Sequence, residues 1–178
     1  MNSMKTDLSY LSVERVFQEF RKALCSSHPT NFFNVLKFSN CLDIHFKEIS
    51  DLIGIEQPLL YHPEGDVYNH TMQVLEKTAL QTQDELTRFG ALVHDFGKTA
   101  TPRENWPHHY GHDKLGVSIV KNFCHRLKMP LLFSKAGIVS CHEHMLAGIY
   151  FTLKPGTKID LFERVYKSKS LSLEGLEI

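Results

Sequence analysis

Cysteine is scarce in this sequence and follows no pattern. The 178 residues include four cysteines, and no two form a Cys-x-x-Cys pair, so neither a zinc knuckle nor a disulfide framework is indicated. Long hydrophobic runs are also missing. No stretch approaches the ~20 apolar residues of a membrane span, and no apolar run follows a basic start. We therefore expect a cytoplasmic protein with reduced thiols and no membrane partner.

An excess of one charge is absent too. Lys and Arg total 20, as do Asp and Glu, so the formal net charge is zero. Non-specific electrostatic binding to nucleic acid is thereby excluded as the main mode of action. Apolar residues make up 42% of the chain, which places it among ordinary globular proteins rather than disordered ones. The length fits one compact domain, with or without a helical extension.

Strand signals are missing, since the sequence has no sustained alternation and no Asn-Gly or Asp-Gly dipeptide. Helical periodicity is frequent, as in the segment from Val13 to Leu24, which Ser12 precedes as a plausible N-cap. The sequence therefore predicts an all-α fold. Gly97 is expected to end one of its helices. The predicted helices cover residues 13–24, 31–38, 42–52, 68–81, 84–98, 113–127, 132–145 and 158–168.

Histidine, in contrast, is abundant. Seven of the 11 histidines lie between residues 94 and 144. His94 and Asp95 stand together at the end of an apolar helix, and such a pair alone is most simply a structural carboxylate beside a core histidine. His70, His112 and His142 change this interpretation, because each falls at a helix start or on a helix face that a bundle can turn inward.

Imidazole and carboxylate together suit a borderline divalent ion such as Mn²⁺, Ni²⁺ or Co²⁺. An ion with three or four protein ligands keeps positions open for water and phosphate. Lys98 follows His94 by one helical turn and is placed to meet a phosphate as a point charge. His109, in the long polar loop after Lys98, is either a substrate contact or a solvated residue. His144 is expected to be exposed, on the helix face opposite His142.

The series His70, His94-Asp95 and His112 resembles the signature of the HD-domain metal-dependent phosphohydrolases. The surrounding sequence is similar to the C-terminal half of the bacterial multifunctional tRNA nucleotidyltransferases, the CCA-adding enzymes. This similarity runs from about Leu11 to Phe162 and is most specific over residues 88–120. The segments that carry it are LSVERVFQEFRKAL, HPEGDVYNHTMQVL, RFGALVHDFGKTATP, WPHHYGHDKLGVSIV and LKPGTKIDLF.

The resemblance implies a compact helical HD-domain bundle over residues 61–168. An N-terminal helical extension, residues 1–60, is similar to the body region of the CCA-adding enzymes, and residues 169–178 form an irregular tail. A divalent metal (Mg, Mn, Ni or Co) would support hydrolysis of 2′,3′-cyclic nucleotides, nucleotides or small phosphate esters. The expected metal ligands are His70, His94, Asp95, His112 and His142. The expected catalytic residues are Asp95, Lys98 and Glu143, and the expected substrate contacts are Lys98 and His109.

Two departures from the family pattern qualify this expectation. The closing acid of the HD motif falls on Tyr166 here, and Asp160 lies too early on its helix to be assumed a substitute. The family's nucleotidyltransferase head needs a Gly-x-Ser turn and paired aspartates, but the chain has no glycine before Gly54 and no Asp-x-Asp. We therefore expect no CCA addition. The alternative to a phosphohydrolase is a non-catalytic remnant of a split or truncated enzyme, which binds tRNA or a separately encoded nucleotidyltransferase head.

Overall fold

The structure is a computed structural model that describes residues 7–171, and over these residues the expected all-α fold is confirmed. The last seven residues of the expected tail lie outside the described range. None of the described helices is long and apolar enough to cross a membrane. The α-helices are α2 (Val13–Leu24), α3 (Thr30–Phe38), α4 (Leu42–His45), α5 (Lys47–Ser50), α6 (Val67–Gln81), α7 (Glu85–Val93), α8 (His112–Arg126), α9 (Leu131–Gly148) and α10 (Pro155–Ser168). Three short 3₁₀ helices join them, η1 (Phe96–Ala100), η2 (Arg103–Asn105) and η3 (Tyr150–Thr152).

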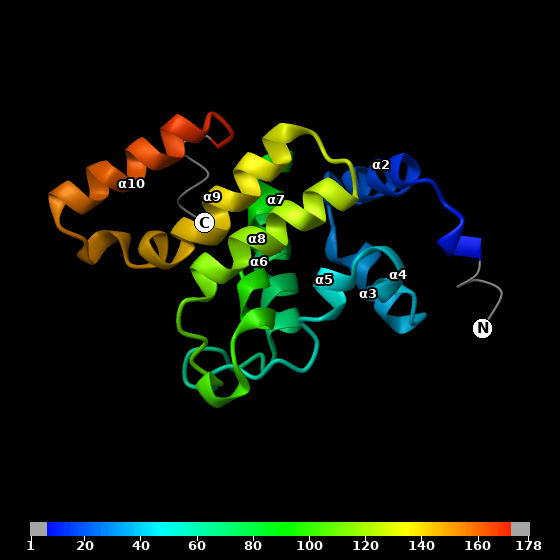
Figure 1. Ribbon diagram of the computed structural model, residues 1–178, viewed down its shortest axis with the longest axis horizontal. Helices are drawn as coiled ribbons and strands as arrows, with labels where there is room; N and C mark the ends of the chain where they lie inside the picture. The colour runs from blue at the N-terminus through cyan, green and yellow to red at the C-terminus, as the bar shows by residue number, and fades with distance from the viewer. Residues whose placement is uncertain (1–6, 172–178) are drawn as a thin grey trace.

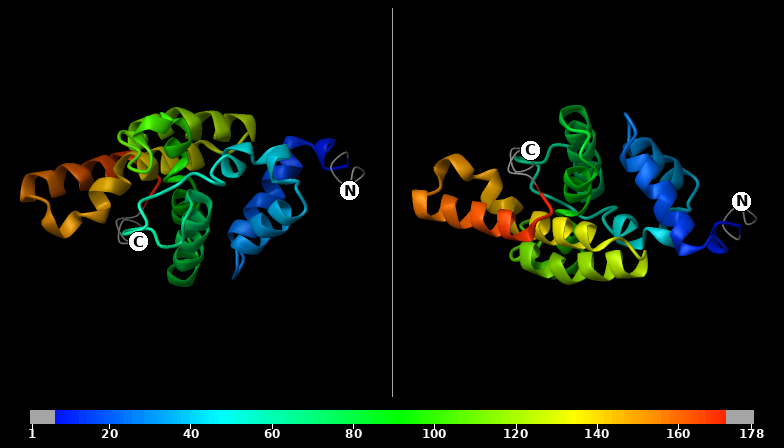
Figure 2. Two further views of the ribbon diagram at one scale, coloured as in Figure 1. Left: turned by 90° about the horizontal axis from the view of Figure 1, so that it is seen from below. Right: turned by 90° about the horizontal axis from the view of Figure 1, so that it is seen from above.

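Helices α6 to α9 form the centre of the molecule (Figure 1). Helix α9 packs against both α7 and α8, while η1 packs against α8 and α6 against α7. Figure 2 shows the N-terminal helices at one end of this bundle and the hairpin of α9 and α10 at the other. The arrangement is therefore the expected helical bundle with an N-terminal helical extension.

One aromatic cluster joins the extension to the bundle. Phe20 of α2 is fully buried, and its ring centroid lies 5.7–6.3 Å from those of four other phenylalanines. We call this set the aromatic cluster; its members are Phe20, Phe33, Phe46, Phe89 and Phe123. Because Phe89 lies on α7 and Phe123 on α8, the two parts share a single apolar core.

A buried arginine makes the second link between extension and bundle. Arg88 on α7 is fully buried and donates hydrogen bonds to four backbone carbonyls. Two of these, of Leu24 and Ser26, lie at the end of α2, and two, of Ala79 and Thr82, lie at the end of α6. The last carbonyls of a helix have no partner within the helix, so one guanidinium satisfies two helix ends at once.

Two of the expected helices are interrupted in the structure, and two others, α9 and α10, extend three residues beyond one expected end. The helix expected over residues 42–52 is broken at Phe46, whose backbone leaves the helical region (φ −122°, ψ 47°) while its ring enters the aromatic cluster. The helix expected over 84–98 ends near His94 and continues as η1. Gly97 is not the helix stop that we expected. It lies inside η1, where a Cβ atom would stand 1.8 Å from the carbonyl oxygen of His112.

Candidate metal centre

The histidines of interest lie at helix ends that the local sequence defines. Asp66 caps α6 by accepting a hydrogen bond from the backbone of Asn69, and this places His70 in the first turn. His94 ends α7, and His112 begins α8 directly after Gly111, whose φ of 77° suits glycine. Each side chain is therefore held by a helix terminus rather than by a free loop.

Two glycines bring η1 and α8 close enough for these ends to meet. A Cβ on Gly97 would collide with the backbone of His112 and Gly116, and a Cβ on Gly116 would lie 2.3 Å from the Sγ atom of Cys141. No side chain separates the two backbones at this point. Asp95, just before η1, consequently faces the first residue of α8.

Asp95 occupies the centre of the cluster and is 2% exposed. Its Oδ2 atom faces the Nε2 atoms of His70 and His94, at 3.8 and 3.2 Å. Its Oδ1 atom faces the Nε2 atoms of His112 and His144, at 3.3 and 3.5 Å. Each oxygen thus meets one pair of imidazoles, and within each triad the ligand atoms lie within 4.8 Å of one another.

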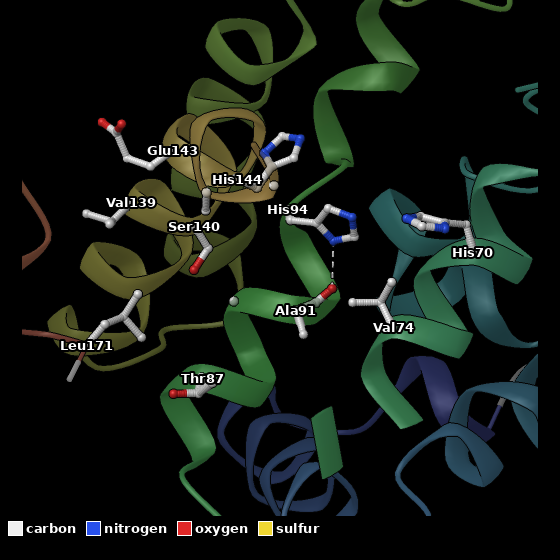
Figure 3. Close-up of a pocket in the computed structure, with 13 residues that line it drawn as sticks. His70, Val74, Thr87, Ala91, His94, Val139, Ser140, Glu143, His144 and Leu171 are labelled. Carbon is white, nitrogen blue, oxygen red and sulfur yellow. Dashed lines mark hydrogen bonds between the residues drawn. The ribbon is translucent and has the colours of Figure 1, made fainter. Parts of the chain in front are cut away.

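The outer nitrogens of these rings fix where the protons sit. The Nδ1 atoms of His94, His112 and His144 each lie 2.8 Å from a backbone carbonyl oxygen, as the dashed line in Figure 3 shows for His94. A carbonyl only accepts, so each Nδ1 carries a proton, and in its neutral form each ring then turns the lone pair of Nε2 inward. His70 does the same toward the carboxylate of Glu64, at 2.6 Å.

Burial keeps part of this ring set neutral. It lowers the pKa of His70 and of His144 to about 4. Burial alone would raise the pKa of Asp95, but His94, His112 and Lys98 outweigh it and hold that pKa well below its usual range. At neutral pH Asp95 is therefore a buried anion, and the rings of His70 and His144 are neutral.

A divalent cation fits this donor set. The Nε2 atoms of His112 and His144 lie only 2.9 Å apart. Two lone pairs at this distance repel each other unless a cation or a proton lies with them. Neutral imidazole and ionised carboxylate are also the forms that ligate metals. The described residues thus offer ligands on both sides of Asp95.

A cavity of about 250 Å³ opens beside the cluster. His70, His94 and His144 stand at it, together with mostly small apolar and hydroxyl side chains (Figure 3). The other lining residues are Val74, Thr87, Gly90, Ala91, Val139, Ser140, Glu143, Ala147, Gly148 and Leu171.

Residues 67–167, more than half of the chain, match the HD domain family. The chain belongs to this family. Residues 1–53 match a region described as the probable RNA and SrmB-binding site of polymerase A. The HD domain thus covers α6 to α10, and the second match covers the N-terminal extension. The expected division at residue 60 stays a prediction.

Two curated relatives show how similar this chain is in sequence to known proteins. The "Multifunctional CCA protein" of Shewanella frigidimarina is 40% identical over 158 residues, which cover 89% of this chain and 38% of the relative. The protein of the same name from Nitrosococcus oceani is 41% identical over 167 residues, covering 93% and 41%. The chain spans about two fifths of the length of these relatives. The expected homology to the C-terminal region of multifunctional CCA proteins is confirmed.

The HD pair and its partners lie together, but one predicted ligand does not join them. His70, His94, Asp95 and His112 all lie in the cluster. His142 is exposed and belongs to neither triad around Asp95, its Nδ1 lying 2.9 Å from Glu143. The two triads also share only Asp95, so no single group of ligand atoms contains the four residues that we expected around one ion.

His144 takes the place that we assigned to His142, and the expectation that His144 is exposed is wrong. Its side chain is 19% exposed and reaches Asp95. The phase of α9 decides this, because Cys141 is buried against Gly116 and residue 144 lies one turn further on the same face. The spacing of Cys141 and His144 was the sequence signal that could have identified His144 as a candidate ligand.

Two further candidates are held by protein partners. The ammonium group of Lys98 is buried and lies 2.7 Å from Asp95 Oδ2 and 2.6 Å from Gln57 Oε1. His109 was expected to touch substrate, but its Nε2 donates to the carbonyl of Glu56 and its Nδ1 lies 2.6 Å from the hydroxyl of Thr101. With both nitrogens engaged and the ring buried, His109 fixes the loop instead.

The acidic positions late in the HD domain lie outside the cluster. Glu143 is buried, and its carboxylate accepts two hydrogen bonds from Arg164 of α10, at 2.7 and 2.9 Å. In Figure 3 it points away from His94, so it reaches the cavity wall but no triad. Tyr166, at the position of the family's closing acid, is 75% exposed. Glu64, which sequence reasoning passed over, contacts a cluster histidine directly.

Proposed function

We propose that this chain is a metal-dependent phosphohydrolase acting on 2′,3′-cyclic nucleotides, nucleotides or small phosphate esters. The observation that carries the proposal is the convergence of four Nε2 atoms on the two oxygens of buried Asp95. Imidazole-rich sites favour Mn²⁺, Ni²⁺ or Co²⁺ over Mg²⁺, so we expect one of these ions to support the reaction best.

Asp95 supplies the negative charge that holds cations on both sides of the carboxylate, and the four rings supply neutral lone pairs. When bound, a divalent ion would activate water and offset the charge that develops on the phosphoryl oxygens. Lys98 keeps a positive charge 2.7 Å from Asp95, which helps to retain an anionic phosphate nearby.

The cavity beside the cluster would bind the organic group of the substrate. Its walls beside His94 and His144 are small apolar groups with the hydroxyl-bearing residues Thr87 and Ser140 among them. Pockets of this kind hold a ligand mainly by apolar contact and orient it with a few polar groups. The volume of about 250 Å³ suits a small ester rather than a polymer.

The test compares wild-type protein with two neutralised aspartates. Hydrolysis of a 2′,3′-cyclic nucleotide is measured with added Mg²⁺, Mn²⁺, Ni²⁺ or Co²⁺, alongside the metal content of each protein. Asp95→Asn should lose at least about 100-fold in rate, because a neutral amide neither offsets a cation nor stays its ligand. The matched control, Asp160→Asn, alters an exposed acid on α10 and should behave as wild type. Activity that survives in Asp95→Asn, or persists after chelation, would contradict the proposal.

A second candidate function rests on the match of residues 1–53. Here the chain would be a non-catalytic module that binds tRNA, or a separately encoded nucleotidyltransferase head, through its N-terminal extension. Fluorescence anisotropy with a labelled tRNA tests the first form of this idea. Salt-sensitive binding by a protein inactive with every ion would favour it, whereas hydrolysis without tRNA binding would exclude it. Under either function we expect no CCA addition to a truncated tRNA.

A further inference from the structure

The loop between α5 and α6 brings two side chains to His70 that the proposed reaction does not use. The loop closes on itself, since the backbone of Val67 donates to the carbonyl of Ile55 and the backbone of Gly54 donates to the carboxylate of Asp66. An isolated bridge between Glu56 and Asp66 lies at the same point. The intervening residues, among them His62 and Glu64, are thereby held against the start of α6.

One carboxylate oxygen in this loop accepts hydrogen bonds from two histidines. Oε1 of Glu64 lies 2.6 Å from Nδ1 of His70 and 3.2 Å from Nδ1 of His62. The two rings meet edge to face, with centroids 4.6 Å apart. The side chain of Asn69 also donates to the backbone carbonyl of Glu64, which holds this residue at the first turn of α6. The contact is therefore built by the fold around it.

His70 differs from the other rings of the cluster in how its proton is held. His94, His112 and His144 donate through Nδ1 to backbone carbonyls, which no substitution can remove. Among these four rings, only His70 directs its Nδ1 atom at a side chain. A neutral imidazole has one N–H group and one lone pair, so the proton given to Glu64 leaves the lone pair of Nε2 for the side facing Asp95.

The same three residues could instead be read as a separate cation site, because their ligand atoms lie within 4.8 Å of one another. Such a site would need the Nδ1 lone pair of His70. The proton would then move to Nε2, and His70 would turn an N–H group toward the metal centre. One neutral imidazole cannot serve both sides, and the 2.6 Å contact to a carboxylate is that of a donated proton.

We propose that Glu64 is a positioning residue, which fixes His70 in the tautomer that presents Nε2 to the metal centre, with His62 steadying the same carboxylate oxygen. The metal part of this inference rests on the proposed function, whereas the tautomer does not. A carboxylate behind a metal-binding histidine orients the ring and raises its basicity, and losing it costs ~10–100-fold in metal affinity.

The test begins with metal-free protein and nitrogen-15 NMR of the His70 ring. Wild-type protein should show a proton on Nδ1. In Glu64→Ala the His70 ring should shift toward the tautomer that carries its proton on Nε2. In Glu64→Gln the amide oxygen still accepts, so the shift should be smaller. His62→Gln should keep the wild-type tautomer of His70, and so should Glu104→Ala, which removes an exposed glutamate far along the chain.

Calorimetric titration with Mn²⁺ or Co²⁺ then follows the same variants. Glu64→Ala should bind ~10–100-fold more weakly, with Glu64→Gln between it and wild type. Should Glu64→Ala fail to fold by circular dichroism, Glu64→Gln carries the test. An unchanged His70 tautomer in the folded variants would overturn the proposal. So would a bound metal equivalent that His62→Gln alone removes, because it would assign these residues to a cation site. An inactive wild-type protein with the expected tautomers would overturn only the proposed function.

Discussion

Helices α7 and α8 bury a different kind of group at each end. At one end Phe89 and Phe123 enter the aromatic cluster, and at the other Asp95 and His112 form the candidate metal centre. Both regions lie at similar depth, with Phe20 fully buried and Asp95 2% exposed. The cluster is held by contacts without direction, whereas each ring of the centre is fixed by one hydrogen bond at Nδ1. The first region therefore sets how stable the protein is, and the second sets where lone pairs point.

The largest effect on stability should come from removing the central ring of the aromatic cluster. Phe20→Ala removes the ring that packs against the other four rings of the aromatic cluster. It should lower the free energy of unfolding by about 3–5 kcal/mol. Urea denaturation followed by circular dichroism measures this loss. At low urea the folded variant should bind Mn²⁺ as wild type does, because η1 and α8 keep their contact at Gly97. A large loss of metal affinity in folded Phe20→Ala would show that the two regions are not separable.

Lowering the pH should destabilise the metal-free protein through the histidines around Asp95 and not through the aromatic cluster. The pKa values of His70 and His144 are about 4 in the folded protein, against ~6.5 for an unfolded histidine. Between these values the unfolded state binds more protons, so stability falls as pH falls, by up to about 3 kcal/mol for each ring. The lowered pKa of Asp95 adds its own loss only below ~3.9, the usual value for aspartate. Urea midpoints of metal-free protein from pH 7 to 4 measure the slope. Phe20→Ala should shift the curve down without changing its shape, and a flat curve in wild type would contradict these pKa values.

A pair of neighbouring histidines tests the phase of α9. His144→Asn removes a ring that faces Asp95. It should weaken Mn²⁺ or Co²⁺ binding by at least ~10–100-fold, the loss that follows when only an outer partner of a metal ligand is removed. His142→Asn removes an exposed ring and serves as the matched control. Calorimetric titration of both variants measures which histidine contributes to metal affinity. If His142→Asn weakens binding more than His144→Asn, the helix phase described above is wrong.

The smallest effect is expected at the position of the family's closing acid. Tyr166→Asp restores that acid in sequence, but residue 166 is exposed on α10 and lies outside both triads. Metal affinity should therefore change less than about twofold, within the scatter of exposed substitutions. Tighter binding on calorimetry would mean that α10 approaches the centre when an ion is present.

These results show where sequence reasoning succeeds. The helix over residues 13–24 was predicted correctly, cap included, because periodicity and the Ser12 hydroxyl act within one turn. The helix over 68–81 was predicted within one residue, but its cap, Asp66, was not predicted. The series of His70, His94, Asp95 and His112 was recognisable because a metal site constrains residue types.

The remaining features depend on contacts distant in sequence. Whether His142 or His144 turns inward is decided by the packing of Cys141 on Gly116, 25 residues away in sequence. The role of Gly97 follows from the backbone of α8 and not from its own helix. Glu64 reaches His70 only because the loop before α6 closes on itself. No local pattern contains this information.

The four hydrogen bonds of Arg88 have a consequence for how the molecule comes apart. This guanidinium belongs to the HD domain, yet two of its acceptors belong to the region matched by the other family. Pulling the regions apart would strand a buried cation and leave the end of α2 without donors, at a cost of several kcal/mol. The two regions match different families, but they should unfold together in a single cooperative transition.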